Sequence, residues 1–235
     1  MTDSITKDRG HIMLSIAIDG PSGAGKSTIA RRVAQMLGFI YVDTGALYRA
    51  VALYMLENGI VPSDSKAVPG ALRDVSLSID YMDGVQRIYL GGRDVSEDIR
   101  RPELSLAASS VSAIPEVRAF LLETQRGFAK NSNVIMDGRD IGTTVLPNAD
   151  LKIFLTATPE DRALRRFREQ REKGFDVDFD SLLADINTRD YNDSHRAISP
   201  LTRAPDAVLI DTTGNELEKS VKIIYDTITE RLGLN

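Results

Sequence analysis

One loop, at residues 20–27, constrains the fold of this chain more than any other segment. Its residues are Gly20, Pro21, Ser22, Gly23, Ala24, Gly25, Lys26 and Ser27. They match the pattern G-x-x-x-x-G-K-[ST], and they lie between the apolar run 14–18 and a segment of helical periodicity that ends at Gly38. A glycine-rich turn between a buried strand and a helix lets successive backbone N–H groups converge on phosphate oxygens, aided by the helix dipole. The loop therefore predicts an α/β protein with a phosphate-binding site.

The ligand expected at this loop is a nucleoside triphosphate with magnesium. Lys26 would reach the β- and γ-phosphates, and the Ser27 hydroxyl would take one magnesium position. Thr28, the next residue in the helix, is included among the residues expected to bind the nucleotide. Asp137, which follows the apolar run 134–136, is expected behind the magnesium, with water between them. Alternatively, Asp137 is a strand-end carboxylate that only caps a turn.

Short apolar runs alternate with segments of helical periodicity along most of the chain. Strands are expected at 14–18, 39–42, 134–136, 151–155 and 207–210, and helices at 46–56, 159–173, 179–195 and 215–232. This alternation with long crossovers is typical of a parallel sheet covered on both faces. We therefore predict a three-layer P-loop NTPase fold with a five-stranded parallel sheet, which forms one domain over residues 13–235. Residues 1–12 are expected to be a flexible N-terminal extension.

The period of the pattern changes between the second and third of these strands. Residues 75–81 and 85–90 alternate between apolar and polar, and Asp83-Gly84 stands between them. An Asp-Gly turn flanked by alternation is a strong hairpin signal. We predict a small antiparallel sheet at about 70–96, within an inserted region at about 60–130, followed by helices that start near Pro102 and Pro115.

Composition excludes several classes of protein. Lys and Arg number 29 against 34 Asp and Glu, a net charge of −5, which disfavours a nucleic-acid partner. The chain has no cysteine, so disulfides, thiol catalysis and Cys-ligated metals are excluded. Its apolar runs are far shorter than the roughly 20 residues of a membrane span. The polar start of the chain lacks the features of a secretory signal, so we expect a cytoplasmic protein.

Arginines stand at many predicted strand and helix ends. They are Arg49, Arg118, Arg139, Arg162, Arg165, Arg166, Arg168, Arg189 and Arg196. If the acceptor is a phosphate monoester, it is largely dianionic at pH 7 and needs no general base. The obstacle is then repulsion between two polyanions, which planar guanidinium groups relieve.

Two of these arginine clusters are expected on helices. Arg162 and Arg166 share a helix face in a predicted lid at about 157–175, unless that face is only a solvated charged surface. Arg189, Asp193 and Arg196 share a face of the next helix, where an exposed ladder of ion pairs is the alternative.

Three segments together resemble the bacterial cytidylate (CMP) kinases. They are Ile18-Asp19-Gly20 through Thr28, Asp43-Thr44-Gly45-Ala46-Leu47-Tyr48-Arg49 and Asp137-Gly138-Arg139-Asp140-Ile141-Gly142. The resemblance continues through 152–155 and 189–201, so it covers nearly all of residues 13–232. It implies transfer of a phosphoryl group from ATP, with Mg²⁺, to CMP or dCMP, and a monomer; the absence of nucleic-acid and membrane partners follows from the charge and the short apolar runs.

The resemblance also implies roles for individual residues. Those that would read the cytosine are Thr44, Arg118, Asp140 and Arg196. Those that would hold the acceptor phosphate are Arg49 and Arg139, and those that would contact the sugar, including the deoxy form, are Ser109, Arg189 and Asp193. Those expected to act in catalysis are Lys26, Arg139, Arg162, Arg166 and Arg189. The family often has Ser where Thr44 stands, and the hydroxyl is retained.

Two other functions stay open on the residues alone. Spacing cannot distinguish a pyrimidine from a purine, so the acceptor could be UMP or another small molecule such as shikimate. The chain could also be a module that binds ATP without turnover, although its arginine array argues against this. A GTPase would need an Asn-Lys-x-Asp segment and an ABC-type ATPase a Leu-Ser-Gly-Gly segment, and the sequence contains neither.

Overall fold

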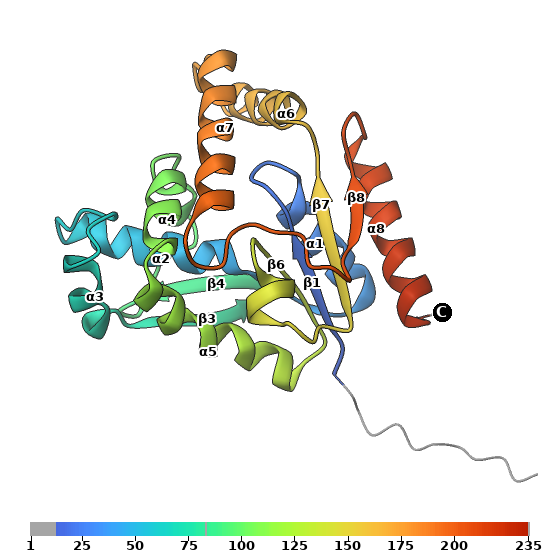
Figure 1. Cartoon of the computed structure of the whole chain (residues 1–235), viewed down its shortest axis with the longest axis horizontal. Coiled ribbons are helices and arrows are strands. Elements are labelled where there is room, and N and C mark those ends of the chain that lie inside the picture. Colours follow the sequence, from blue (N-terminus) through green and yellow to red (C-terminus); the bar gives the residue numbers. More distant parts are fainter. Residues whose placement is uncertain (1–12, 83, 235) are drawn as a thin grey trace, which may run out of the picture.

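A five-stranded parallel sheet organises the molecule (Figure 1). The computed structural model describes residues 13–82 and 84–234, so the predicted extension at 1–12 lies outside the described residues. The strands are β1 (Ser15–Asp19), β2 (Ile40–Asp43), β6 (Val134–Gly138), β7 (Leu151–Thr156) and β8 (Val208–Asp211), in the order β2-β6-β1-β7-β8. All four pairings are parallel, so the predicted sheet is confirmed.

Apolar side chains on both faces of the sheet explain its three layers. On one face, Ile16 and Ile18 pack in a buried cluster with residues of α1 (Lys26–Leu37) and α8 (Leu217–Leu232). On the other face, Ala17 and Met136 pack with α5 (Pro115–Asn131) and with a short π-helical turn, η3 (Ile141–Val145). Burial on both faces accounts for the unbroken apolar runs of the central strands.

The inserted region has an apolar core of its own. It contains α3 (Ala67–Ala71), α4 (Leu104–Ser112) and an antiparallel sheet of β3 (Leu77–Met82), β4 (Val85–Leu90) and β5 (Arg93–Asp94), and α2 (Thr44–Glu57), which precedes it, packs in the same apolar core. The predicted hairpin is confirmed, with Tyr81 paired to Gln86 and Met82 to Val85. Asp83 of its turn lies outside the described residues.

Some local elements of this region differ from the prediction. The helix expected near Pro102 begins at Leu104, because the preceding residues form a turn. By contrast, α5 does begin at Pro115. The prediction missed α3, and it also missed the two 3₁₀ turns η1 (Leu72–Asp74) and η2 (Asp98–Arg100). These elements are too short to show a helical period in the sequence.

Two helices project beyond the carboxyl ends of the strands (Figure 1). They are α6 (Pro159–Glu172) and α7 (Phe179–His195), and their positions agree with the predicted helices within one residue. Thr158 caps α6 by accepting from the Asp161 N–H, and Phe167 packs edge-on against Phe179 with ring centroids 6.2 Å apart. Within residues 13–82 and 84–234, no helix is long and apolar enough to cross a membrane.

Candidate active site

A cavity of about 850 Å³ lies where the loop at 20–27 meets the inserted region and the projecting helices. Its walls come from the loop, the start of α2, α4, the turn that follows β6, α6, α7 and the start of α8. A pocket outside the carboxyl ends of parallel strands is where α/β folds bind their ligands. Of the predicted site residues, the cavity is lined by Ser22, Gly23, Gly25, Lys26, Ser27, Thr28, Thr44, Arg49, Arg118, Asp137, Arg139, Asp140, Arg162, Arg166, Arg189, Asp193 and Arg196.

The loop needs its glycines for steric reasons. A Cβ on Gly20 would lie 1.9 Å from the carbonyl oxygen of Leu155 at the end of β7. Gly25 has φ of 84° and directly precedes α1, a left-handed conformation that favours glycine. Gly20, Pro21 and Ala24 lie behind the cavity surface, so they shape the loop and do not line the cavity.

Lys26 is held in the loop as a buried cation. Its Nζ donates to the carbonyl oxygen of Pro21 at 2.7 Å, and only 5% of the residue is exposed. Burial lowers the pKa of Lys26 well below its ordinary value, the nearby cations Arg139 and Arg189 lower it further, and the carboxylates of Asp137 and Asp19 offset this only in part. The ammonium therefore stands at the cavity wall with like charges beside it.

Ser27 and Asp137 form a pair of oxygen donors beside the loop. The Ser27 hydroxyl donates to Asp137 Oδ2 at 2.8 Å, and Tyr41 Oη donates to Oδ1 at 2.9 Å. Burial raises the pKa of Asp137 to about 6, and the carboxylate of Asp43, which lies opposite it in the β2–β6 register, acts in the same direction. Among the described residues, no group of three or more Asp, Glu, His or Cys side chains could hold a metal ion alone.

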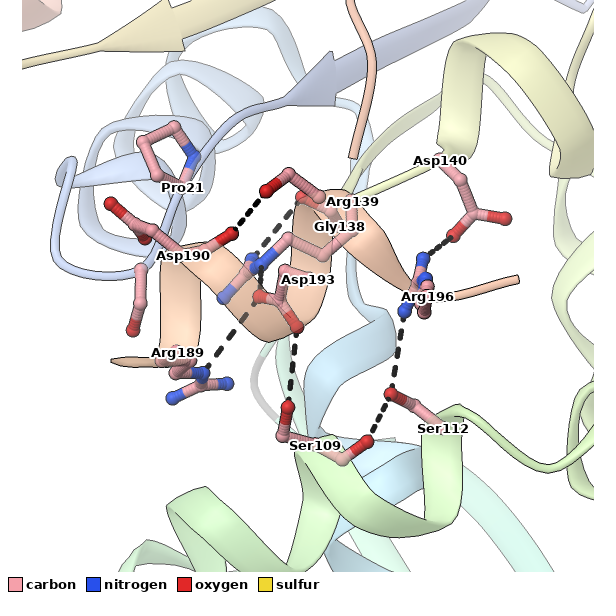
Figure 2. Close-up of polar contacts among 12 residues, drawn as sticks. Pro21, Ser109, Ser112, Gly138, Arg139, Asp140, Arg189, Asp190, Asp193 and Arg196 are labelled. Atoms are coloured by element: carbon pink, nitrogen blue, oxygen red, sulfur yellow. Dashed lines mark hydrogen bonds and ion pairs between the residues drawn. The ribbon is translucent and has the colours of Figure 1, made fainter. Parts of the chain in front are cut away.

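Two arginines approach the buried carboxylate of Asp193 on α7 (Figure 2), and a third, Arg49, lines the same cavity. Arg139 Nε donates to Asp193 Oδ2 at 2.8 Å, and Arg189 Nε lies 3.9 Å from the same oxygen. Arg49 is paired with Asp43 at 2.9 Å. Burial lowers the pKa of Arg189, and repulsion from Arg139 adds to that effect. Arg139 and Arg189 thus share a single buried carboxylate.

A second cluster centres on Asp140. Arg118 donates to Asp140 Oδ2 in a buried ion pair, and Arg196 Nη2 lies 3.3 Å from Oδ1. The Arg118 guanidinium also lies over the ring of Tyr48, 5.8 Å from its centroid. Thr44, whose hydroxyl donates to the Asp137 carbonyl oxygen at 2.7 Å, lines the same cavity. Of the four residues predicted to read the base, three are therefore in contact and the fourth lines the same cavity.

The arginines of α6 differ in how many hydrogen bonds and ion pairs they form. Arg162 is buried: it donates to the carbonyl oxygens of Ala157 and Ser22 at 2.9 Å and is paired with Asp190. Arg162 thereby ties the loop to α7. Arg166 lines the cavity, and no ion pair is recorded for it within the described part of the chain.

Sequence comparison assigns the chain to a family. A sequence model described as cytidylate kinase matches residues 16–230. The chain belongs to the cytidylate kinase family. The cytidylate kinase of Caldicellulosiruptor bescii is 52% identical over 91% of this chain and 94% of its own length, and that of Leuconostoc mesenteroides is 46% identical over 92% and 97%. The resemblance drawn from the motifs is confirmed, and with it the prediction that the protein is an enzyme of this family.

Solved structures add little beyond the sequence relatives. A shikimate kinase from Bacteroides thetaiotaomicron is 17% identical, covering 94% of this chain and 99% of its own, with a TM-score of 0.44. That likeness is too weak to favour shikimate as a substrate of this member of the cytidylate kinase family.

Several residues of this kinase site escaped prediction. Asp19, at the end of β1, accepts from the N–H groups of Ile141 and Gly142, both at 2.7 Å, and so holds the turn that carries Asp140. The sequence signal that could have identified Asp19 was its position directly before Gly20 of the loop.

Two serines of α4 carry no such signal. Ser105 accepts from Arg189, and Ser112 accepts from Arg196 at 3.3 Å. Both line the cavity, whereas the predicted Ser109 does not line it and instead donates to Asp193 at 3.3 Å. Neutral residues that meet partners 84 positions away show no pattern in one sequence.

Proposed function

We propose that the protein transfers the γ-phosphoryl group of MgATP to CMP and dCMP, giving CDP and dCDP. Membership of the cytidylate kinase family supports this. The observation that carries the proposal is the crowding of Lys26, Arg139 and Arg189 at one cavity wall, where burial and mutual repulsion lower the pKa of Lys26 and of Arg189. Such a concentration of cations is unfavourable in the free protein and complements two polyanionic substrates.

The reaction follows from the charge of the acceptor. An oxygen of the acceptor phosphate attacks the γ-phosphorus while the bond between that phosphorus and the β–γ bridging oxygen breaks, which leaves ADP. Because the acceptor phosphate is already ionised, no side chain has to remove a proton. Lys26 binds the donor phosphates, and Arg49 and Arg139 hold the acceptor phosphate. The charge on the transferred group is stabilised by Lys26, Arg139, Arg162, Arg166 and Arg189.

The donors at the loop fit a magnesium ion. Ser27 Oγ and the carboxylate of Asp137 are hard oxygen donors of the kind Mg²⁺ prefers, and Mg²⁺ usually keeps waters and takes phosphate oxygens for the rest of its shell. Ser27 would contact the ion directly and Asp137 through water. Bound there, Mg²⁺ would neutralise charge on the donor phosphates.

The second cluster has the donors and acceptors that cytosine needs. The Asp140 carboxylate and the Thr44 hydroxyl can accept from an exocyclic amine, and Arg118 and Arg196 can donate to a ring nitrogen and carbonyl oxygen. We assign the sugar to Asp193, Arg189 and Ser109, with Ser109 acting through its bond to Asp193.

We also propose that two regions close over the substrates, the lid at about 157–175 and the inserted region at about 60–130. Closure would exclude water that otherwise hydrolyses ATP. Residues 13–235 are proposed to form the kinase domain, which acts as a cytoplasmic monomer. Light scattering of the purified protein tests the monomer, and cell fractionation tests the compartment.

A panel of acceptors tests the proposed function. ADP release would be measured with CMP, dCMP, UMP, AMP and shikimate, each with and without magnesium. We expect CMP and dCMP to accelerate ATP consumption and the others to do so far less. Faster turnover with UMP or shikimate would replace the proposed acceptor, and ATP binding without any acceptor-dependent turnover would indicate a nucleotide-binding module.

A further inference from the structure

One polar residue interrupts the apolar face of the β3–β4 hairpin. Ile88 and Leu90 of β4 are buried, and Leu77 and Ile79 of β3 pack against the same apolar cluster. Side chains alternate along a strand, so Gln86 continues this inward row. An amide in such a row costs free energy unless it is hydrogen-bonded.

The amide of Gln86 is bonded to the main chain of a single residue. Its Oε1 accepts from the Asp43 N–H at 2.7 Å, and its Nε2 donates to the Asp43 carbonyl oxygen at 3.3 Å. Tyr81, directly opposite Gln86 in the hairpin, donates through its hydroxyl to the carbonyl oxygen of Tyr41 at 3.0 Å. Because β2 is an edge strand of the parallel sheet, these two side chains cover backbone groups that no neighbouring strand pairs.

Asp43 connects this edge to the cavity. Its Oδ1 caps α2 by accepting from the Ala46 N–H at 2.9 Å, and its Oδ2 accepts from Arg49 Nη2 at 2.9 Å. A Cβ on Gly45 would lie 3.1 Å from Asp43 Oδ1 and 3.2 Å from Arg49 Nη1, so the glycine leaves room for this pair. The direction of the Arg49 guanidinium therefore depends on where the main chain of Asp43 is held.

We propose that Gln86 is a positioning residue for the acceptor phosphate. Its amide holds the main chain of Asp43, and Asp43 in turn aims Arg49 into the cavity. The inserted antiparallel sheet thus fixes part of the acceptor site without touching the acceptor. This inference rests on the proposed role of Arg49. The bond from Tyr81 covers the same strand edge but holds Tyr41, which does not line the cavity, so Tyr81 is a matched control.

The first test compares Gln86→Met with Tyr81→Phe. Methionine keeps the length of the side chain and removes both hydrogen bonds, and Tyr81→Phe removes one bond at the same edge. We expect Gln86→Met to raise KM for CMP about tenfold, as a misdirected positioning group does, with KM for ATP within about twofold of its original value. Tyr81→Phe should lower Tm and leave KM for CMP unchanged.

The second test asks whether Gln86 acts through Arg49. In an Arg49→Ala background, Gln86→Met should change KM for CMP little, because the group it positions is gone. If Gln86→Met does not fold, Gln86→Glu, which keeps the oxygen that accepts from the Asp43 N–H, replaces it in both tests and should raise KM for CMP less.

The outcomes separate this inference from the proposed function. An unchanged KM for CMP in the folded variant, an equal change in KM for ATP, or effects that add in the Arg49→Ala background would each overturn the role of Gln86. Absence of CMP-dependent turnover in the unaltered protein would instead overturn the proposed function on which it rests.

Discussion

Replacing Lys26 with methionine should stabilise the free protein while it removes most of the activity. The Lys26 ammonium is buried beside Arg139 and Arg189, and the acceptor recorded for it in the described structure is the Pro21 carbonyl oxygen. An ammonium has three N–H donors, so its hydration is poorly replaced. Methionine has a similar length and carries no charge.

The expected magnitude comes from two opposing contributions. The substitution removes one charge-assisted hydrogen bond, worth about 1.5–3 kcal/mol. It also removes the cost of burying a cation, which is several kcal/mol before pairing. We expect a net gain of about 1 kcal/mol, typical of replacing a functional residue, and a rise in Tm of about 3 °C for a chain of this size. The loss of a charge at the transferred group should lower kcat by at least about 100-fold.

The pH dependence supplies a sharper readout. The pKa of folded Lys26 lies below its unfolded value, so between these two values the unfolded state binds more protons. The free energy of unfolding therefore rises with pH in that window, as the buried group loses its charge. The stability advantage of Lys26→Met should therefore shrink as the pH rises through this window towards the ordinary pKa of lysine. Chemical denaturation at several pH values measures it.

Lys152 provides the matched control. It is also a buried lysine, but its ammonium is paired with the largely exposed carboxylate of Asp206 at 2.9 Å, and it does not line the cavity. Lys152→Met should leave activity near its original level and should not raise Tm. The reasoning is refuted if Lys26→Met lowers Tm as much as Lys152→Met does, or if it retains more than about a tenth of the activity.

Three further substitutions follow from the same site. Asp193→Ala should weaken CMP binding more than ATP binding, because it releases two arginines on the acceptor side; titration calorimetry with each nucleotide would show this, and equal weakening would contradict it. Asp137 has a pKa raised to about 6, so the carboxyl is about half protonated near pH 6 and MgATP binding there should release up to about half a proton; Asp137→Asn or a pH near 8 should abolish the release seen by calorimetry in different buffers. Gly20→Ala places a Cβ 1.9 Å from the Leu155 carbonyl oxygen, so ATP affinity should fall at least about tenfold, whereas an unchanged affinity would mean that the loop tolerates the contact.

Much of the fold was predictable because its signals are local. The strands of the parallel sheet are short apolar runs, and the Asp-Gly turn marks the hairpin of the insert. The loop at 20–27 combines a motif with its required position between strand and helix. By contrast, the π-helical turn η3 depends on a carboxylate more than 120 positions earlier, at Asp19. No window of the sequence contains that interaction.

The residues of the candidate site also differ in whether a local sequence signal identifies them. Charged residues such as Arg139 and Asp193 could be predicted because many charges gather at the ends of predicted strands and helices. Such a concentration of charge indicates a binding site for a charged ligand. Ser112 and Gln86 could not, because a neutral side chain that meets a distant backbone or guanidinium has no periodicity. The role of each charged residue was less predictable than its place in the site. Arg162 was expected to act in catalysis, but several of its N–H groups are hydrogen-bonded to the Ala157 and Ser22 carbonyl oxygens and to Asp190.

The arrangement around Asp193 shows that the proposed acceptor site is built from several parts of the chain (Figure 2). Its carboxylate, on α7, accepts from Arg139 in the turn after β6 and from Ser109 on α4, while Arg189 lies 3.9 Å away on its own helix. The parallel sheet, the inserted region and the projecting helices thus each contribute one contact to a single buried group. Because an unpaired buried charge costs several kcal/mol, separation of α7 from the turn after β6, which would break the pair between Arg139 and Asp193, is opposed at this point.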